Sequence, residues 1–493
     1  MQTYLPFEAQ LNRNPEFKRN VWIELSPGRL IAMPAIILAV LAAVSAASQS
    51  SVDQSTPIKT TSMAIYYVLV FLWGTKLAVD SIIDEVNAKT WIQQQMSPLS
   101  AWKMALGKLF GAIIYAWYGG VISLVIYTFA ALGNGDGWSA FHSLFTMLFS
   151  GMTAHAVAMI LALISLRKSR NNKKIKSTAI YIIALVTIGY FSRIGSIVGS
   201  TLLKTSYWYG IAMPFTLMDA FSVLLCCFWA VIALQRNMRT ELQFENGMKT
   251  WYWFLGTFTF YIAGFASQMG HINDSLKNSG IYNNSLTNHS VDDSSVLLLM
   301  GYYAFLFLGG LAFLLAFIEP KDAVNFRRLR MSYHQQNWKK FNVYLPLWVP
   351  TLVAAGVAAI VTVIIGFASG DSKAFSITDI PPLYPLTIFV FLARDVALIM
   401  WLNAIGRGKS PDTSAFVYLV VLHIIFPMMF SLGSLADPGA NRMLALFLPM
   451  PTGGSYLSLA LGTVQAAIIC GLCVRSWQSR NEALEARFAV AGT

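Results

Sequence analysis

Long apolar runs dominate this chain and constrain its fold more than any other feature. Of its 493 residues, 56% are hydrophobic and only 12% are charged, whereas soluble domains carry about 25% charged residues. A helix needs roughly 20 apolar residues to cross the hydrocarbon core of a membrane. Such runs occur at 30–47, 63–83, 108–132, 141–166, 178–200, 211–235, 251–269, 295–318, 347–368, 386–405, 414–435 and 453–474. We therefore predict an all-α integral membrane protein with about twelve transmembrane helices.

The positions of the basic residues indicate how these helices are oriented. If the N-terminus lies in the cytoplasm and the spans alternate, the outer segments hold only Lys59, Lys204, Lys277, Lys373 and Arg442. Two predicted inner loops, 167–176 and 321–340, are especially basic. Because cytoplasmic loops of membrane proteins are enriched in Lys and Arg, we expect both termini in the cytoplasm. The net charge of +12 then reflects topology and contact with anionic membrane lipid, not nucleic-acid binding.

The residues before the first apolar run are predicted to form a helix at the membrane surface. Residues 14–23, NPEFKRNVWI, mix charged with aromatic and aliphatic side chains. A helix of this composition lies in the interface between lipid and water. A disordered tail is the alternative interpretation.

A polar segment that carries two tryptophans separates the second and third apolar runs. Residues 84–108 read DEVNAKTWIQQQMSPLSAWKMALGK. Landmarks recur along it, namely Glu85, Thr90, Ser97-Pro98 and Gly107-Lys108. We expect a helix over 84–106 at the cytoplasmic surface, where a partner could dock.

This segment resembles the cytoplasmic coupling segment of type-2 ATP-binding-cassette (ABC) export permeases, where an acidic residue, a Gly-Thr, a Ser-Pro and a Gly-Lys recur at the same rhythm. Lys89 stands where the family usually has glycine, and 91–95 replaces a leucine-rich middle. The resemblance implies a permease subunit in the bacterial inner membrane, driven by cytoplasmic ABC ATPase subunits. ATP and Mg would bind the two nucleotide-binding domains of that partner, and this chain would hold no cofactor. The predicted docking residues are Glu85, Thr90, Trp91, Ser97, Pro98, Trp102 and Trp338.

Some side chains of this segment have alternative interpretations. Trp91 and Trp102 could be anchors in a groove of the partner or belt residues at the level of the lipid headgroups. Glu85 could pair with an arginine of the partner or mark the end of a span. Lys103 and Lys108 are expected to contact phospholipid.

The second half of the chain repeats landmarks of the first at a nearly constant offset. Segments 84–87 and 322–325 each follow a second span, and Met-Pro steps at 213–214 and 450–451 each open a sixth span. We therefore predict two six-span units related by a pseudo-twofold axis along the membrane normal. Residues 1–245 form the first unit, with the coupling helix 84–106. Residues 246–493 form the second, with a diverged coupling helix at 322–342.

No site for ATP hydrolysis is visible in the sequence. A phosphate-binding loop needs the pattern G-x-x-x-x-G-K-[ST]. Gly408-Lys409-Ser410 lacks its first glycine, because Asn403 stands there, and Gly107-Lys108 is followed by Leu109. The six histidines lack the spacing of metal ligands. We therefore expect no catalytic residue and no metal in this chain, with ATPase activity only in a complex.

Charged residues inside spans are candidates for a substrate path or gate, because charge is costly in the membrane. The four candidates are Arg394, Asp395, Arg193 and Asp219. Arg394 and Asp395 are adjacent in mid-span, so we expect their side chains to point apart and meet other helices, in a substrate path or as interhelical bracing. Arg193 and Asp219 lie toward the outer ends of two spans and could form a gate pair. Lys76 and Asp80, one turn apart, are expected to form a structural pair.

Several functional classes are compatible with these features. The favoured one is a permease that couples ATP hydrolysis by a separate ATPase to outward movement of an amphipathic or lipid-linked substrate. A twelve-span secondary transporter is an alternative, although the acids that proton coupling needs are few here. A membrane enzyme would need His, Asp or Glu clustered at the surface. A mechanical adaptor that an ABC ATPase drives without transport is also compatible.

Overall fold

The computed structural model builds the chain from α-helices and one small hairpin. It describes residues 14–48, 55–133, 137–168, 177–198, 205–268, 293–321, 323–368, 381–405, 411–433, 441–450 and 455–491. Within these ranges the strands are confined to a hairpin of β1 (Thr205–Trp208) and β2 (Ile211–Pro214). Ten of the described helices are long and apolar enough to cross a membrane. The chain is therefore an all-α, multi-pass membrane protein.

Two of the twelve predicted spans do not meet these criteria in the described residues. At 178–200 the chain forms α10 (Ser177–Val198), whose described apolar part covers only Ser177–Thr187. At 251–269 it forms α12 (Lys249–Ala263), a helix of 15 residues. A helix of that length rises about 22 Å, which is less than the roughly 30 Å of the hydrocarbon core.

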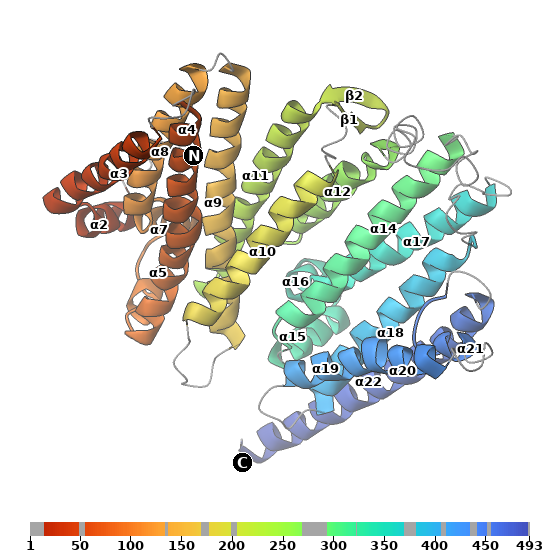
Figure 1. The fold of residues 1–493 in the computed structure, drawn as a ribbon. Helices are drawn as coiled ribbons and strands as arrows, with labels where there is room; N and C mark the ends of the chain where they lie inside the picture. The colour runs from red at the N-terminus through yellow and green to blue at the C-terminus, as the bar shows by residue number, and fades with distance from the viewer. Residues whose placement is uncertain are drawn as a thin grey trace, which may run out of the picture. The chain divides into compact units, whose positions relative to one another are not determined.

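The chain divides into two compact units, whose helices Figure 1 labels. The first unit comprises Met1–Ser206 and Met213–Asn246, and the second comprises Tyr207–Ala212 and Gly247–Thr493. The main boundary lies next to the predicted division after residue 245.

The first unit contains a short surface helix, five candidate spans, and two short helices between the second and third spans. In chain order its helices are α2 (Pro15–Glu24), α3 (Pro27–Ala47), α4 (Ser55–Tyr66), η1 (Tyr67–Gly74), α5 (Thr75–Asn87), α6 (Trp91–Gln95), α7 (Ala101–Gly111), α8 (Ile114–Gly133), α9 (Gly137–Lys168), α10 and α11 (Phe215–Glu241). The second span is one continuous helix, α4–η1–α5, with a π-helical middle. The helix predicted before the first span is present as α2.

Local sequence explains where α2 and α7 begin. The side chain of Asn14 accepts a hydrogen bond from the backbone N–H of Glu16 at 3.1 Å, and Pro15 occupies the first helical position. Asn is a preferred N-cap, and Pro fits the first turn because its missing N–H would have no partner there. Ser100 caps α7 through the N–H of Lys103.

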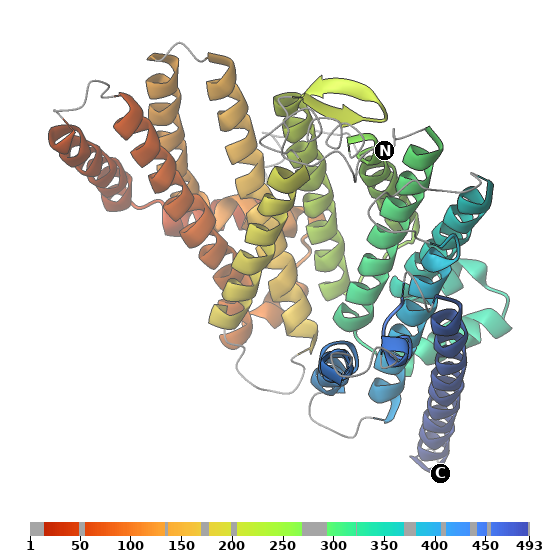
Figure 2. The ribbon, with the colours of Figure 1, turned by 45° about the vertical axis from the view of Figure 1, so that its right-hand side comes forward.

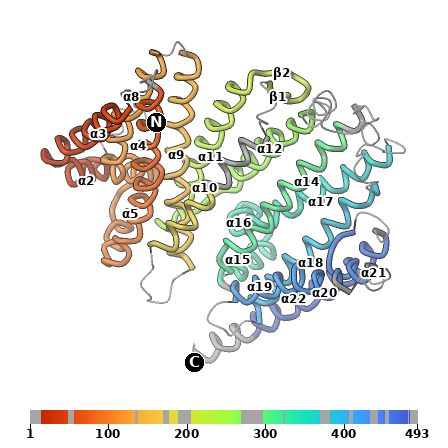
Figure 3. Tube along the Cα trace, in the orientation of Figure 1, coloured from red at the N-terminus to blue at the C-terminus, as the bar shows by residue number. Residues whose placement is uncertain are grey.

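The second unit resembles the first in having two short helices between two of its spans, although its π-helical segment lies in a later span than that of the first unit. Its helices are α12, α14 (Asp293–Ile318), α15 (Ala323–His334), α16 (Trp338–Tyr344), α17 (Trp348–Ala368), α18 (Tyr384–Ile405), α19 (Pro411–Val420), η2 (Val421–Ile425), α20 (Phe426–Gly433), α21 (Asn441–Leu444) and α22 (Ser455–Ala491). Figure 3 traces this path. Equivalent helices also pack together: α4 contacts α8 as α14 contacts α17, and α9 contacts α11 as α18 contacts α22.

The largest buried cluster of the first unit lies where α5, α7, α9 and α11 meet. It includes Ile82, Met104, Met159 and Leu234. The long helices lie beside one another in Figure 2, and alanines such as Ala158 on α9 are fully buried between them. Small residues allow helix backbones to approach closely in membranes. The polar segment after α5 packs against this cluster through Trp91, Ala101 and Met104.

Candidate functional site

The segment predicted as one coupling helix, 84–106, is broken into pieces. The helix α5 ends at Asn87, α6 covers Trp91–Gln95, and α7 begins at Ala101. Two features explain the breaks. Lys89 adopts a positive φ of 61°, the conformation that ends a helix and that glycine takes most easily. Pro98 disfavours helical geometry in the residue before it. The predicted third span, 108–132, accordingly begins only at Ile114.

The left-handed position of Lys89 lies where the resembled family usually has glycine. The N–H of Thr90 bonds the carbonyl of Glu85 at 2.9 Å, and the N–H of Lys89 bonds that of Val86 at 3.1 Å. These two bonds form the Schellman motif, which turns the chain sharply at a helix end. The turn that the family's glycine would permit is therefore made here by a lysine.

A partly buried ionic cluster attaches this segment to α2. Lys108 on α7 is 1% exposed, and its Nζ lies 2.5 Å from Glu85 Oε2 and 3.4 Å from Glu16 Oε1. Lys108 also donates to the carbonyl of Ser81 at 3.2 Å. Arg19 of α2 reaches Glu85 Oε1 at 2.7 Å and Glu16 Oε1 at 3.0 Å. Two cations thus face two carboxylates, which is how buried charge is tolerated in proteins.

This cluster corrects two expectations. Lys108 does not contact phospholipid, because α2 packs over α7 and covers it. Glu85 is engaged inside its own unit with Lys108 and Arg19, and its Oε1 also accepts from Gln94 Nε2 at 2.6 Å. Its carboxylate therefore ties α5, α6, α7 and α2 together and does not point freely toward a partner.

Trp91 is likewise internal. Its side chain is 5% exposed and belongs to the main buried cluster of the first unit. The ring centroid lies 5.7 Å from Lys108 Nζ, a cation–π arrangement. Gln95, one turn further along α6, donates to the carbonyl of Glu241 at the end of α11 at 2.9 Å. The expectation that Trp91 anchors a partner is therefore wrong, because this face of α6 packs on its own bundle.

The opposite face of α6 is exposed. Met96 is 81% exposed, and Ile92, one turn before it, is exposed as well. Among the predicted docking residues of this segment, Thr90, Pro98 and Trp102 are exposed and Ser97 is half-buried. Ile92 and Met96 are exposed residues that no motif of the segment pointed to. They are spaced four apart and each follows directly after a more buried residue, Trp91 and Gln95 respectively, which places them on one side of the chain.

Gly107 permits the close contact between α7 and α2. A Cβ at this position would lie 2.8 Å from Glu16 Cβ, closer than carbon atoms can pack. We expect Gly107→Ala to push α2 away and to destabilise the first unit by about 1–3 kcal/mol. Faster hydrogen exchange in 15–24 would report the effect. Gly256→Ala on α12 is the matched control, because nothing lies within 4 Å of its added Cβ. Equal hydrogen-exchange rates of 15–24 in the two variants would contradict the role of Gly107.

A second group of charged side chains lies in the middle of the second unit. Arg394 on α18 is 1% exposed, and its Nε donates to Asp395 Oδ1 at 2.9 Å. It also donates to Gln465 Oε1 of α22 at 2.8 Å. His423 lies 2.8 Å from Asp395 Oδ2, and the guanidinium is 4.5 Å from the ring centroid of Phe391. The network joins α18, η2 and α22.

The geometry of this network corrects the prediction that Arg394 and Asp395 point apart. The long arginine side chain bends across the helix surface to its neighbour, while both groups also reach other helices. His423 lies on η2, and π-helical turns are frequent at functional sites. The structure thus adds His423 and Gln465 to the candidates, which no sequence spacing could identify.

The remaining predicted residues are placed as follows. Asp219 lies 3.1 Å from His142 Nε2 of α9, while the side chain of Arg193 lies outside the described residues, so the gate pair stays a prediction. Lys76 Nζ and Asp80 Oδ2 are 2.6 Å apart, which confirms the predicted pair.

Trp338 is exposed on α16. The predicted coupling helix 322–342 is two helices, α15 and α16, joined by a turn in which Gln336 has a φ of 53°.

Comparisons of the chain with protein-family models, with curated proteins and with solved structures give no match in any of the three.

Proposed function

We propose that this chain is the membrane-spanning permease of an ABC exporter. In this proposal a separate cytoplasmic ATPase binds the exposed face of α6 and drives outward movement of an amphipathic or lipid-linked substrate. The two units act as six-span halves related by a pseudo-twofold axis. The observation that carries the proposal is the rigid attachment of a short exposed helix between two spans, through the buried pairing of Lys108 with Glu85.

The physical argument is mechanical. The exposed face of α6, with Ile92 and Met96, offers an apolar contact for a partner. Its buried face is fixed by Trp91, and Gln95 bonds the end of α11. A force applied to α6 is therefore transmitted to α5, α7 and α11 and is not absorbed by a flexible loop. Each unit has a pair of short helices between two of its spans, α6 and α7 in the first and α15 and α16 in the second, which supports the two-half arrangement.

We expect Met96→Asp to weaken binding of the ATPase strongly. A carboxylate buried in an apolar contact is costly, so the affinity should fall about ten-fold or more. The measurement is co-purification of the tagged full chain with a soluble ABC ATPase from the same cells, together with ATP hydrolysis by the complex. Ala88→Asp, at an exposed position of the same segment, is the control and should leave both unchanged. Absence of an ATPase partner from the wild-type complex, or full coupling in Met96→Asp, would refute the proposal.

A further inference from the structure

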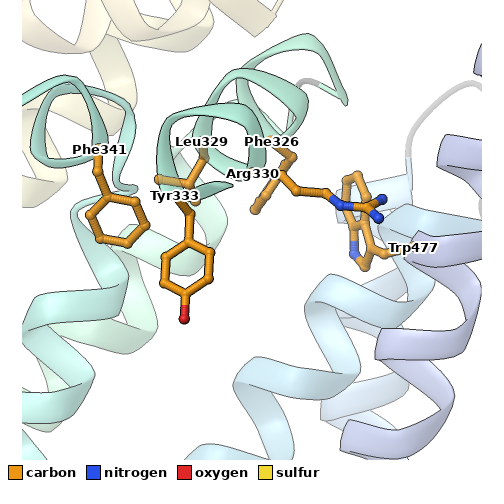
Figure 4. Close-up of a pocket in the computed structure, with 6 residues that line it drawn as sticks. All are labelled: Phe326, Leu329, Arg330, Tyr333, Phe341 and Trp477. Atoms are coloured by element: carbon orange, nitrogen blue, oxygen red, sulfur yellow. The ribbon is translucent and has the colours of Figure 1, made fainter. Parts of the chain in front are cut away.

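The second unit carries a groove between its short helices and its last span (Figure 4). Six side chains line it, namely Phe326, Leu329, Arg330, Tyr333, Phe341 and Trp477. Its volume is about 310 Å³. The four lining residues of α15 follow the i, i+3, i+4, i+7 pattern of one helix face. In Figure 4 the side chain of Arg330 extends toward Trp477.

The groove lies near the ends of three candidate spans, where membrane-spanning helices reach the membrane surface. The helix α14 ends at Ile318 and α17 begins at Trp348, so α15 and α16 connect the same ends of two spans. Trp477 lies one turn before the end of the candidate span Tyr456–Arg480. Its ring centroid is 4.6 Å from that of Phe326. Tryptophan is enriched at this depth because its ring is apolar and its N–H is polar.

The surface beside the groove is apolar and exposed. Met331, Tyr333 and Trp338 are all exposed. The rings of Tyr333 and Trp338 lie 6.1 Å apart, and that of Phe341 is 5.8 Å from Trp338. A helix with such a face lies in the membrane interface, with its apolar side among the first acyl carbons.

The same helices are strongly basic. Between residues 323 and 344 the basic side chains are Arg327, Arg328, Arg330, Lys339 and Lys340, and the sequence there has no Asp or Glu. Within the part of the chain that the structure describes, no carboxylate forms an ion pair with Arg330. Arg480 places its guanidinium 5.3 Å from the ring centroid of Trp477, at the edge of the groove.

We infer that this groove binds an anionic phospholipid of the surrounding membrane. The headgroup phosphate lies against Arg330, and the glycerol and upper acyl chain lie along Phe326 and Trp477. An aromatic lining beside basic side chains matches a molecule that is apolar at one end and anionic at the other. The exposed face at α6 differs in this respect, since α6 and Met96, which follows it directly, carry no basic side chain. This inference does not depend on coupling to an ATPase.

Photo-crosslinking of the full chain in nanodiscs tests the inference. Photoactivatable phosphatidylglycerol should label peptides covering 326–341 and 477, and the matching phosphatidylcholine probe should label them far less. Arg330→Glu changes the charge by two units, so labelling at subsaturating probe should fall roughly 25-fold, at about five-fold per charge. Arg330→Lys, which keeps the charge, should retain most of it. Lys103→Glu, at an exposed position of the first unit, should leave the labelling of these peptides unchanged.

Three results would overturn the inference. The first is equal labelling by the two probes, and the second is unchanged labelling in a monodisperse Arg330→Glu or Arg330→Gln protein. The third is loss of phosphatidylglycerol labelling on addition of a purified ATPase partner, which would make this face a protein-docking surface. An ATPase that binds without changing the labelling supports the lipid site and leaves the contact at α6 as a separate result.

Discussion

Replacing Lys108 by methionine should destabilise the first unit by about 3–5 kcal/mol. Methionine matches lysine in length but carries no charge, so Glu85 and Glu16 would face each other in a largely buried site with Arg19 as their only cation among the four cluster residues. Removing one partner of a buried pair is costly because the other charge stays without compensation. The measurement is denaturant unfolding of the detergent-solubilised protein.

The pair Lys76–Asp80 provides the control for this prediction. Its lysine side chain is 50% exposed, so Lys76→Met should cost at most about 1 kcal/mol. The double variant Lys108→Met with Glu85→Gln removes one charge of each sign and should recover part of the stability lost in Lys108→Met. If Lys108→Met lowered the free energy of unfolding no more than Lys76→Met does, the ionic cluster could not be what attaches α6 and α7 to the rest of the unit.

Arg394→Met should lower the free energy of unfolding of the second unit by a similar amount, about 3–5 kcal/mol. It would leave Asp395 with only His423 as a partner in mid-span, where an uncompensated carboxylate is costly. The double variant Arg394→Met with Asp395→Asn removes both charges and should recover most of this stability. Unfolding of the two single variants and the double variant, in a double-mutant cycle, measures the coupling. Strictly additive effects would show that the two side chains do not act as a pair.

If the chain is the proposed permease, transport by the same variants would separate the two roles considered for this network. If Arg394 and Asp395 only brace α18, the stability-restored double variant should also regain transport. If they line the substrate path, transport should remain lost although the protein is folded. Gln465→Leu, which removes one hydrogen-bond partner of Arg394, should have an intermediate effect on stability.

Features of this protein that depend only on neighbours along the chain could be predicted from its sequence. The apolar runs predicted helices and spans, because a run of apolar residues can satisfy its backbone in lipid only by forming a helix. The pairing of Lys76 with Asp80 followed from one turn of one helix. Pro98 also predicts the break between α6 and α7, because proline disfavours helical geometry in the residue before it. The single helix expected over 84–106 did not take this into account.

The positions of Lys108, Trp91 and Arg394 could not be obtained in this way. Lys108 is buried because α2, distant in sequence, packs across α7 at Gly107. Arg394 bonds Gln465, which lies on α22. Apolar pattern and local geometry alone determined that this chain crosses a membrane as helices. Only the tertiary structure decided which polar side chains are exposed to partners, because burial depends on which helices meet, and one helix does not specify its neighbour.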